Sequence, residues 1–294
     1  SLTGLKLWLR ADAGVPTGYG DIWEDQSGNG NHATQTNGTA IPKWVPNAAN
    51  GLPALYFDGN DVVNFTTRLT TIRTVFWVVK ESASATAEYR PLLGDSSTIE
   101  FIGGYGAPGT IWFSGYTSNY IVNGQTWLNG SPVSGTATAR PRTMSVVSVV
   151  TTGPVNASNF GFAQPWNQYW WGDLAELVVY DRALTMTERK AVEDYLLNKY
   201  RLGVAVTAPT ISPNGGLFTD SVAVTIQTPT PGAEIYYTTD GSEPTTSSPL
   251  YTGGLTLTAT TTVKAKAIVP GYGESTTVVA GFTRDSDFNP KSLT

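Results

Sequence analysis

The chain has 294 residues, a formal net charge of −5 at pH 7, a charged fraction of only 14% and no cysteine. The negative balance argues against nucleic acid and anionic membranes as partners, because both attract basic surfaces. The lack of cysteine excludes disulfides, thiol catalysis and zinc thiolate sites. A chain of this length can hold one large and one smaller domain, and its abundant Gly, Thr, Ser, Asn and Pro are typical of turn-rich, all-β proteins.

The first predicted strand, Leu5–Arg10, leads into a glycine-rich loop with side-chain oxygens at every second position. The oxygen-bearing residues are Asp25, Ser27, Asn29 and Asn31. Ca²⁺ binds roughly six to eight oxygens, so this pattern predicts a structural calcium site. The alternative is a loop held by Asx-turns, in which Asp and Asn bond their own backbone. An EF-hand is excluded, because its twelfth position falls on Thr36 instead of glutamate.

Further strands are predicted where β-branched and aromatic residues run between Gly, Pro and Asn. They are Ala54–Phe57, Thr74–Val79, Met144–Val150 and Leu174–Tyr180. Thr74–Val79 and Met144–Val150 have the composition of central strands with at least one buried face. We therefore expect Trp77 in the core.

One helix is predicted after the last of these strands. Thr185 and Glu188 fit a capping box, in which the hydroxyl and the carboxylate each bind an orphan amide. The residues that then recur at helical spacing are Val192, Tyr195, Leu196 and Lys199. Gly203 is the expected C-terminal cap. We expect this helix to pack on the sheet and close the first domain.

Three segments of this region carry a family resemblance through their order and spacing. They are Gly4–Asp12, Asn50–Gly59 and Trp171–Thr185, with the glycine-rich loop between the first two. Together they resemble the laminin-G-like, concanavalin A-like domains of bacterial secreted proteins, over roughly residues 1–203. The resemblance implies a concanavalin A-like jelly-roll sandwich with one C-terminal helix. It does not fix a function, since such domains bind sugars, bind proteins or space other modules.

After a short connection at Val204–Ala208, residues 209–283 are predicted to form an independent, small β-sandwich. Ser221–Ile226 and Thr262–Ile268 alternate, so that each strand puts one face in a core and one in water. Glu234–Thr238 is another predicted strand, followed by a tight-turn signal at Asp240 and Gly241.

This second region carries its own resemblance. The segments are Pro209–Gly216, Ile235–Thr245, Val263–Ile268 and Pro270–Ser275. They resemble the C-terminal domain of chitobiase and β-hexosaminidase, which implies an immunoglobulin-like, non-catalytic module found beside polysaccharide-degrading domains. Residues 284–294 are interpreted as a polar tail or linker.

The sequence shows no recognisable catalytic constellation. Sandwich glycosidases usually carry two carboxylates on one strand, two residues apart, and we find no such run. Asp173 and Glu176 lie three apart, so a regular strand would point them to opposite faces, and we expect a buried structural role for Glu176. His32 is the only histidine, and it lies in the glycine-rich loop without a nucleophile elbow.

Aromatic side chains in polar loops are the best indication of a ligand site. Sugars present flat C–H faces that stack on Trp and Tyr, and hydroxyls that bind polar side chains. The regions 105–127 and 162–171 combine both kinds of residue. The predicted ligand-binding residues are Trp166, Tyr169, Trp112, Tyr116, Tyr120 and Trp127. The alternative for each is a place in the core or at a protein interface.

The sequence therefore predicts a non-catalytic carbohydrate-binding region of an exported, multimodular bacterial protein, extracellular or at the cell surface. Its partners would be a polysaccharide or glycan and other domains of a longer chain, since it starts without Met and ends in a polar tail. No apolar run approaches the ~20 residues of a membrane span. One alternative is a protein-binding or spacer module of a surface adhesin. The other is an enzyme of unrecognised type, in which Glu88, Asp95 or Glu100 converges with Arg90 or Arg140.

Overall fold

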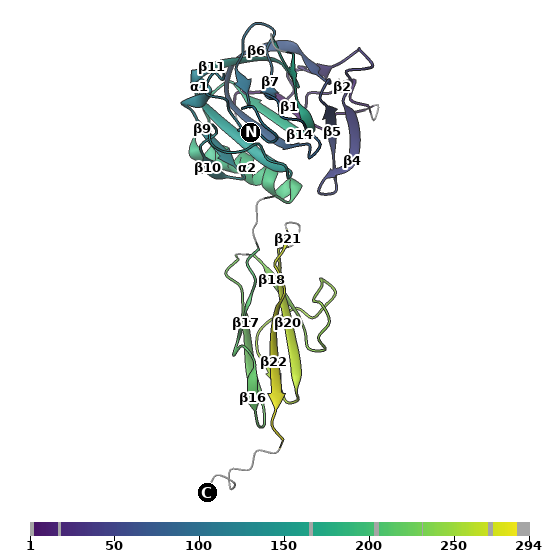
Figure 1. The fold of residues 1–294 in the computed structure, drawn as a ribbon, viewed down its shortest axis with the longest axis vertical. Helices are drawn as coiled ribbons and strands as arrows, with labels where there is room; N and C mark the ends of the chain where they lie inside the picture. Colours follow the sequence, from purple (N-terminus) through teal and green to yellow (C-terminus); the bar gives the residue numbers. More distant parts are fainter. Residues whose placement is uncertain are drawn as a thin grey trace. The chain divides into compact units, whose positions relative to one another are not determined.

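The computed structural model describes residues 3–16, 19–164, 167–202, 206–230, 232–269 and 273–286. The chain divides into two compact units, Ser1–Gly203 and Val204–Thr294. Both are built mainly from antiparallel strands, as Figure 1 shows, which confirms the predicted all-β fold. Within the described residues, neither helix has the length and the apolar run that crossing a membrane requires.

The first unit contains the strands β1 to β14 and both helices. The strand bounds are β1 Leu5–Arg10, β2 Ile22–Trp23, β3 Ala33–Thr34, β4 Lys43–Ala49, β5 Leu52–Asp58, β6 Val63–Glu81, β7 Pro91–Leu93, β8 Phe101–Ile102, β9 Gln125–Leu128, β10 Ser131–Val133, β11 Ser145–Phe160, β12 Phe162–Ala163, β13 Gln168–Tyr169 and β14 Trp171–Tyr180. The helices are α1 Asn119–Val122 and α2 Met186–Tyr200. Each strand predicted for this unit overlaps an observed one.

A large sheet organises the unit, with strands in the order β10-β9-β11-β6-β14-β5-β4. Strand β1 pairs with β14, and β3 joins β2 to β6. Strands β6 and β11 pair from Ser145 with Val79 to Phe160 with Val63, with register shifts between Val150 and Asn159. These two long strands therefore carry most of the central pairing of the sandwich.

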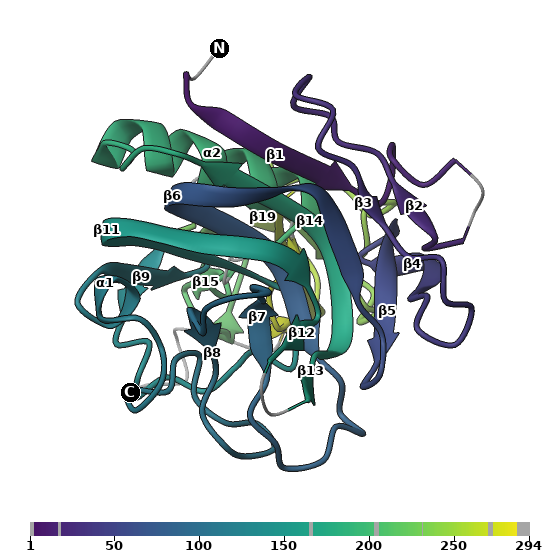
Figure 2. The ribbon, with the colours of Figure 1, turned by 90° about the horizontal axis from the view of Figure 1, so that it is seen from above.

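Both faces of β6 are buried from Thr74 to Val79, because each is covered there by a different layer. Phe76 and Val78 belong to a core cluster shared with α2. Val75 and Trp77 belong to a second cluster that includes β7 and β8. Figure 2 shows α2 on one side of the sheet and β7 and β8 on the other. Trp77 is fully buried, as predicted, and its indole N–H donates to the carbonyl of Leu92 at 3.0 Å.

Helix α2 begins with the predicted capping box. The Thr185 hydroxyl accepts the N–H of Glu188, and the Glu188 carboxylate accepts the N–H of Thr185 at 2.9 Å. The helix ends at Tyr200, and Arg201 takes the left-handed conformation of the cap with a φ of 55°. The predicted cap, Gly203, lies outside the described residues. Val192 and Leu196 are buried against the sheet, whereas Tyr195 is partly exposed.

The second unit holds the remaining strands. Their bounds are β15 Thr210–Ser212, β16 Gly216–Phe218, β17 Val222–Gln227, β18 Glu234–Thr238, β19 Leu255–Leu257, β20 Thr261–Val269, β21 Gly273–Glu274 and β22 Val278–Arg284. One sheet has the order β15-β17-β19 and the other β16-β22-β20-β18, with β21 beside β20. Apolar residues of both sheets, among them Val224, Val263 and Phe282, form one core. The predicted turn is present, with Gly241 at a φ of 81° and Asp240 accepting the N–H of Ser242.

Candidate functional site

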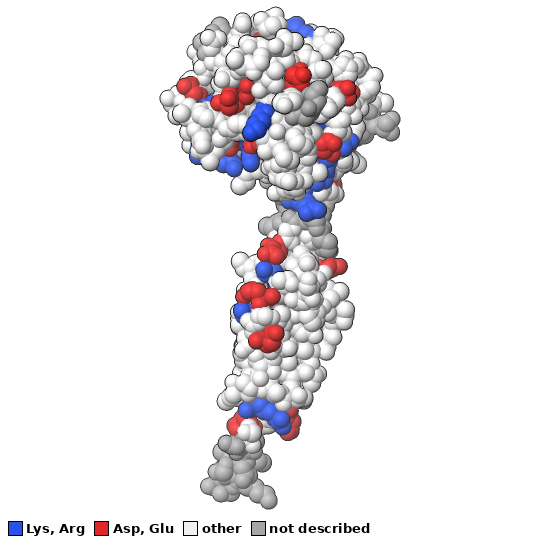
Figure 3. Space-filling view, turned by 90° about the vertical axis from the view of Figure 1, so that its right-hand side faces the viewer, with Lys and Arg blue, Asp and Glu red and all other residues white. Residues whose placement is uncertain are grey.

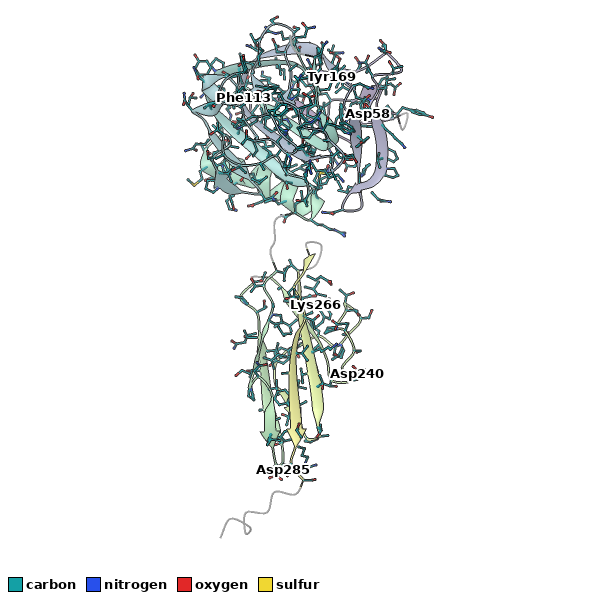
Figure 4. The ribbon with its side chains drawn as sticks, viewed as in Figure 1. Asp58, Phe113, Tyr169, Asp240, Lys266 and Asp285 are labelled. Carbon is teal, nitrogen blue, oxygen red and sulfur yellow. The ribbon has the colours of Figure 1, made fainter. Side chains whose placement is uncertain are left out.

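A polar and aromatic pocket of about 200 Å³ lies where the end of β5 meets the start of β14. The lining residues are Asp58, Gly59, Thr86, Glu88, Arg90, Asn167, Gln168, Tyr169 and Trp171. We call this site the Arg90 pocket. Figure 4 labels Asp58 and Tyr169, which reach it from strands far apart in the sequence. Its volume is below the ~300–1,000 Å³ of sites for drug-sized molecules, so it suits a group about the size of one sugar ring.

Trp171 is the largest aromatic surface of the pocket. Its indole N–H donates to the hydroxyl of Tyr56 at 2.8 Å, which fixes the plane of the ring. The backbone of Gly59 approaches the ring so closely that an added Cβ would lie 3.2 Å from it. Gly59 also has a φ of +99°, a conformation that residues with a Cβ rarely adopt, so glycine is favoured there. The ring is therefore held in one orientation before any ligand arrives.

Arg90 is 3% exposed and ties together the segments that line the pocket. Its guanidinium donates to the carbonyl oxygens of Tyr169 and Thr86, at 2.9 Å each. Its Nε lies 3.3 Å from the carboxylate of Glu81. Burial lowers the pKa of Arg90, and the negative charge of Glu81 opposes this shift. Arg90 therefore works mainly as a clamp on two pocket-lining segments.

Glu81 binds a second arginine at the same depth. The guanidinium of Arg140 lies 3.3 Å from the Glu81 carboxylate, and both side chains are fully buried. Arg140 also donates to the carbonyl oxygens of Gly104 at 2.6 Å, Gly106 at 3.1 Å and Glu88 at 3.3 Å. One carboxylate thus anchors two arginines that hold the surrounding loops. Such prior ordering reduces the entropy lost when a ligand binds.

The rim of the pocket carries hydrogen-bond acceptors. Asp58 and Glu88 are exposed there, next to the amides of Asn167 and Gln168. Asp61 lies behind Asp58, and its carboxylate accepts the N–H of Asp58 at 2.8 Å. Burial raises the pKa of Asp61 to about 6; the hydrogen bond from the Asp58 N–H lowers this pKa, and the Asp58 carboxylate raises it. The rim therefore offers groups that bind hydroxyl or amide N–H groups of a ligand.

The aromatic residues predicted to bind a ligand lie in different environments in the structure. Tyr169 lines the Arg90 pocket, and its ring packs on Phe162 at 4.8 Å between centroids. Trp166 lies outside the described residues. The prediction for Trp112 is wrong, because this residue is only 1% exposed and donates to the Thr126 hydroxyl at 2.8 Å inside the core. The sequence could not show this burial, since Trp112 sits in a loop that folds over the sheet.

Trp127 is also buried, and it lines a different cleft from the Arg90 pocket. The guanidinium of Arg189 stacks over its ring at 3.9 Å, at the side of a separate cleft of about 420 Å³. Little of the Trp127 ring is open to a ligand. Tyr116 and Tyr120 are about half exposed, and neither lines the Arg90 pocket.

The sequence missed Asp58, Arg90 and Trp171 as lining residues of one pocket. Asp58 and Trp171 are directly paired across β5 and β14. A correct prediction that β5 pairs with β14 would have placed Asp58 and Trp171 side by side. Arg90 reaches the pocket through carbonyl contacts, which leave no pattern in a sequence.

The glycine-rich loop is held by the carboxylate of Asp25. One oxygen accepts the N–H groups of Trp8 and Ser27, at 2.9 Å each. The other accepts the Ser27 hydroxyl at 2.7 Å and the Asn31 N–H at 3.0 Å. His32 accepts the N–H of Asp25 through Nδ1. These are the bonds of the Asx-turn alternative.

The four predicted metal ligands do not share a free set of oxygens in this arrangement. The amide of Asn29 donates to the carbonyl of Leu5, and the oxygen of Asn31 accepts the N–H of Thr67. A calcium ion would have to replace several of these donors. The described residues hold no group of three or more acidic or histidine side chains suited to a metal. Calcium binding stays a prediction.

The carboxylates considered for catalysis are paired separately. Asp95 forms a two-point ion pair with Arg68, at 2.8 and 2.9 Å. Glu100 accepts the amide of Asn156, and Glu88 lies near Arg90. Of these three carboxylates only Glu88 lines a pocket with Arg90, so the three do not converge on one site, and the enzyme alternative stays untested.

Asp173 and Glu176 also have separate partners. A register shift between Leu174 and Glu176 breaks the regular alternation that we expected for this strand. Asp173 pairs with Lys80 at 3.3 Å, and burial raises its pKa. Glu176 is fully buried and accepts the Trp8 indole, which agrees with the structural role expected from the sequence.

Comparisons with known proteins bear mainly on the second unit. Residues 213–280 match the family model of the chitobiase/beta-hexosaminidase C-terminal domain. A search of curated proteins found no match. Among solved structures, the glycoside hydrolase domain of Endo-D from Streptococcus pneumoniae R6 is similar over 93% of this chain, with 14% identity and a TM-score of 0.21. The chain covers 43% of that structure, and a score this low carries no argument about fold. The laminin-G-like resemblance of the first unit stays a prediction.

Proposed function

We propose that the first unit binds a neutral glycan through the Arg90 pocket and is not itself catalytic. The observation that carries this proposal is the meeting of Trp171 and Tyr169 with amide and carboxylate side chains in one preformed, ring-sized pocket. The apolar face of a sugar would pack on the aromatic rings. Its hydroxyls would donate to Asp58 and Glu88 and bond with the neighbouring amides.

The charges of the pocket favour a neutral ligand. Its one arginine is buried and compensated by Glu81, whereas Asp58 and Glu88 expose their carboxylates. Among the described residues that line the pocket, no free cation would balance this pair of negative charges when a sugar acid binds. On the face drawn in Figure 3, acidic and basic side chains of the first unit are scattered, with no gathered basic patch for an anionic polymer.

The second unit indicates the kind of protein in which this glycan-binding site would occur. We propose that it is the non-catalytic, immunoglobulin-like companion that its family match suggests, in an exported protein with further domains. The name of that family, which refers to two glycan-cleaving enzymes, makes oligomers of N-acetylglucosamine the first ligands to test.

The test is titration of the whole chain with neutral glycans and with sugar acids. The variants are Tyr169→Ala and Glu88→Ala, with Trp166→Ala to examine the neighbouring predicted residue. Tyr19→Ala and Glu24→Ala are matched controls, because both side chains are exposed on other loops of the same unit. We expect loss of glycan binding in the pocket variants alone. Binding that survives both Tyr169→Ala and Glu88→Ala would refute the site.

The same glycans also serve to test for catalysis, by an assay for the release of reducing ends. Two carboxylates at one pocket meet the minimum requirement of a glycosidase. Asp58 and Glu88 are both exposed to solvent, whereas the general acid of a glycosidase usually lies in an apolar pocket. Reducing-end release from any bound glycan, abolished by Glu88→Gln, would overturn the non-catalytic assignment. A chain that binds none of the glycans would favour the spacer or protein-binding alternative.

A further inference from the structure

Four aromatic side chains form a continuous row on the first unit. In spatial order they are Tyr105, Tyr89, Phe113 and Tyr116. Successive ring centroids lie 5.4, 5.0 and 5.4 Å apart, with interplanar angles of 60°, 46° and 48°. The two ends are open to solvent, with Tyr105 62% and Tyr116 52% exposed. We call this set the aromatic row; Figure 4 labels its member Phe113.

The backbone beneath the aromatic row is fixed from inside. Arg140 binds the carbonyls of Gly104 and Gly106, on either side of Tyr105, and that of Glu88, which precedes Tyr89. At the other end, the N–H of Phe113 donates to the carbonyl of Ile102 at 2.8 Å. The Tyr105 and Tyr89 end of the row is therefore held by the same buried ion cluster that supports the Arg90 pocket.

Gly115 makes room for the Phe113 ring in the second half of the row. A Cβ added at Gly115 would lie 2.9 Å from two atoms of the Phe113 ring, which is closer than side chains normally come. Gly115 thus leaves room for the Phe113 ring, which is tilted by 46° to the ring of Tyr89 and by 48° to that of Tyr116. This arrangement keeps successive rings in contact instead of burying them.

The segment that carries Tyr105, Phe113 and Tyr116 is uncharged. From Phe101 to Ala139 the sequence contains no Lys, Arg, Asp or Glu. A nucleic acid would need cations there to offset its phosphates. The nearby chain instead supplies Ser, Thr, Asn and Tyr groups, which bond readily to uncharged hydroxyls. The chemistry of the row thus fits a neutral, hydroxyl-rich polymer.

The row and the Arg90 pocket are joined through three consecutive residues. Glu88 and Arg90 line the pocket, and Tyr89 between them belongs to the row. We infer that the row extends the pocket into a longer site, so that the ligand is a chain of several neutral sugar units. This inference rests on the proposed function, because it assumes that one end of the glycan chain occupies the Arg90 pocket.

The experiment compares retention of the full chain on chitin, cellulose, xylan and a soluble β-glucan with its affinity for N-acetylglucosamine and its di- to hexasaccharides. The row variant is Tyr105→Ala/Tyr116→Ala, and Tyr105→Phe/Tyr116→Phe keeps the rings without their hydroxyls. Tyr19→Ala is the control for an exposed tyrosine elsewhere, and Tyr169→Ala/Glu88→Ala is the pocket variant. Because Tyr105 and Tyr116 are exposed, their loss should leave the melting temperature nearly unchanged.

We expect affinity to rise with oligomer length in the natural chain. The row variant should weaken polymer and hexasaccharide binding about tenfold or more, while mono- and disaccharide binding stays unchanged. The phenylalanine variant should retain most of the polymer affinity. The pocket variant should have a lower affinity for glycans of every length.

Two results would overturn the inference while leaving the proposed function intact. One is equal loss, or no loss, for short and long ligands in the row variant. The other is a row variant that changes only self-association, which would make the row a contact between copies of the chain. If instead only the row variant matters, the Arg90 pocket is not the glycan site. If no glycan of the set is retained, both proposals fall.

Discussion

Arg140 and Glu81 form a buried ion pair, with 3.3 Å between the guanidinium and the carboxylate and no exposure of either side chain. Arg140 also donates to four loop carbonyls, so its removal would leave these acceptors without that donor and the buried Glu81 carboxylate with Arg90 alone. We expect Arg140→Ala to lower the free energy of unfolding of the first unit by about 3 kcal/mol or more.

Tryptophan fluorescence in a urea titration measures this change directly, because all 9 tryptophans lie at or before Trp171, within the first unit. Lys190→Ala is the matched control, since it breaks an exposed pair with Asp194 and should cost less than about 1 kcal/mol. Equal losses in the two variants would contradict the role given to the buried pair.

A second prediction concerns the attachment of α2 to the sheet. The carboxylate of Glu176 accepts the Trp8 indole N–H at 2.6 Å, the Lys199 ammonium at 2.6 Å and the Tyr200 hydroxyl at 2.9 Å. Glu176→Gln removes the charge and turns an amide donor toward these donors. We expect a loss of about 2–4 kcal/mol in unfolding free energy and earlier proteolytic cutting in the α2 region. A variant as stable as the natural chain would argue against this structural role.

The predicted strands and the capping box could be read from the sequence because their signals are local. Alternation and β-branched runs marked β17, β18 and β20, and Thr185 and Glu188 marked the start of α2 within four residues. Trp77 was assigned to the core correctly, since it lies in an apolar strand that both layers cover.

The candidate site depends on contacts that no local pattern records. Asp58, Arg90 and Trp171 come from three segments, and only the pairing of β5 with β14 and the clamp of Arg90 bring them together. Trp112 stands in a polar, glycine-rich stretch, so its composition suggested exposure. Its burial follows from the segment between β8 and α1, which packs the Trp112 ring against that of Trp77.

The glycine-rich loop provides a prediction that separates its two interpretations. Asp25 accepts four hydrogen bonds, so Asp25→Ala should destabilise the first unit by about 2 kcal/mol or more, whether CaCl₂ or EDTA is present. Melting curves of both proteins in each condition measure this. A bound calcium ion would instead add stability to the natural chain in CaCl₂ and lose it in millimolar EDTA. Such a difference, absent in Asp25→Ala, would favour the calcium site over hydrogen bonding alone.

Asp61 should make the first unit less stable as the pH rises. Its folded-state pKa of about 6 is above the ordinary value of 3.8, so the fold favours the protonated carboxyl. The stabilising contribution is complete below about pH 4 and is lost as the pH rises through 6. Asp61→Asn cannot ionise and can still accept the Asp58 N–H through its amide oxygen. We therefore expect the free energy of unfolding of Asp61→Asn to exceed that of the natural chain by roughly 1–3 kcal/mol at pH 7.5 and to match it near pH 4. Urea titrations followed by tryptophan fluorescence measure both values. Asp194→Asn, at an exposed site, should show no such pH-dependent gap, and a gap for Asp61→Asn that is constant with pH would mean that its carboxyl titrates normally.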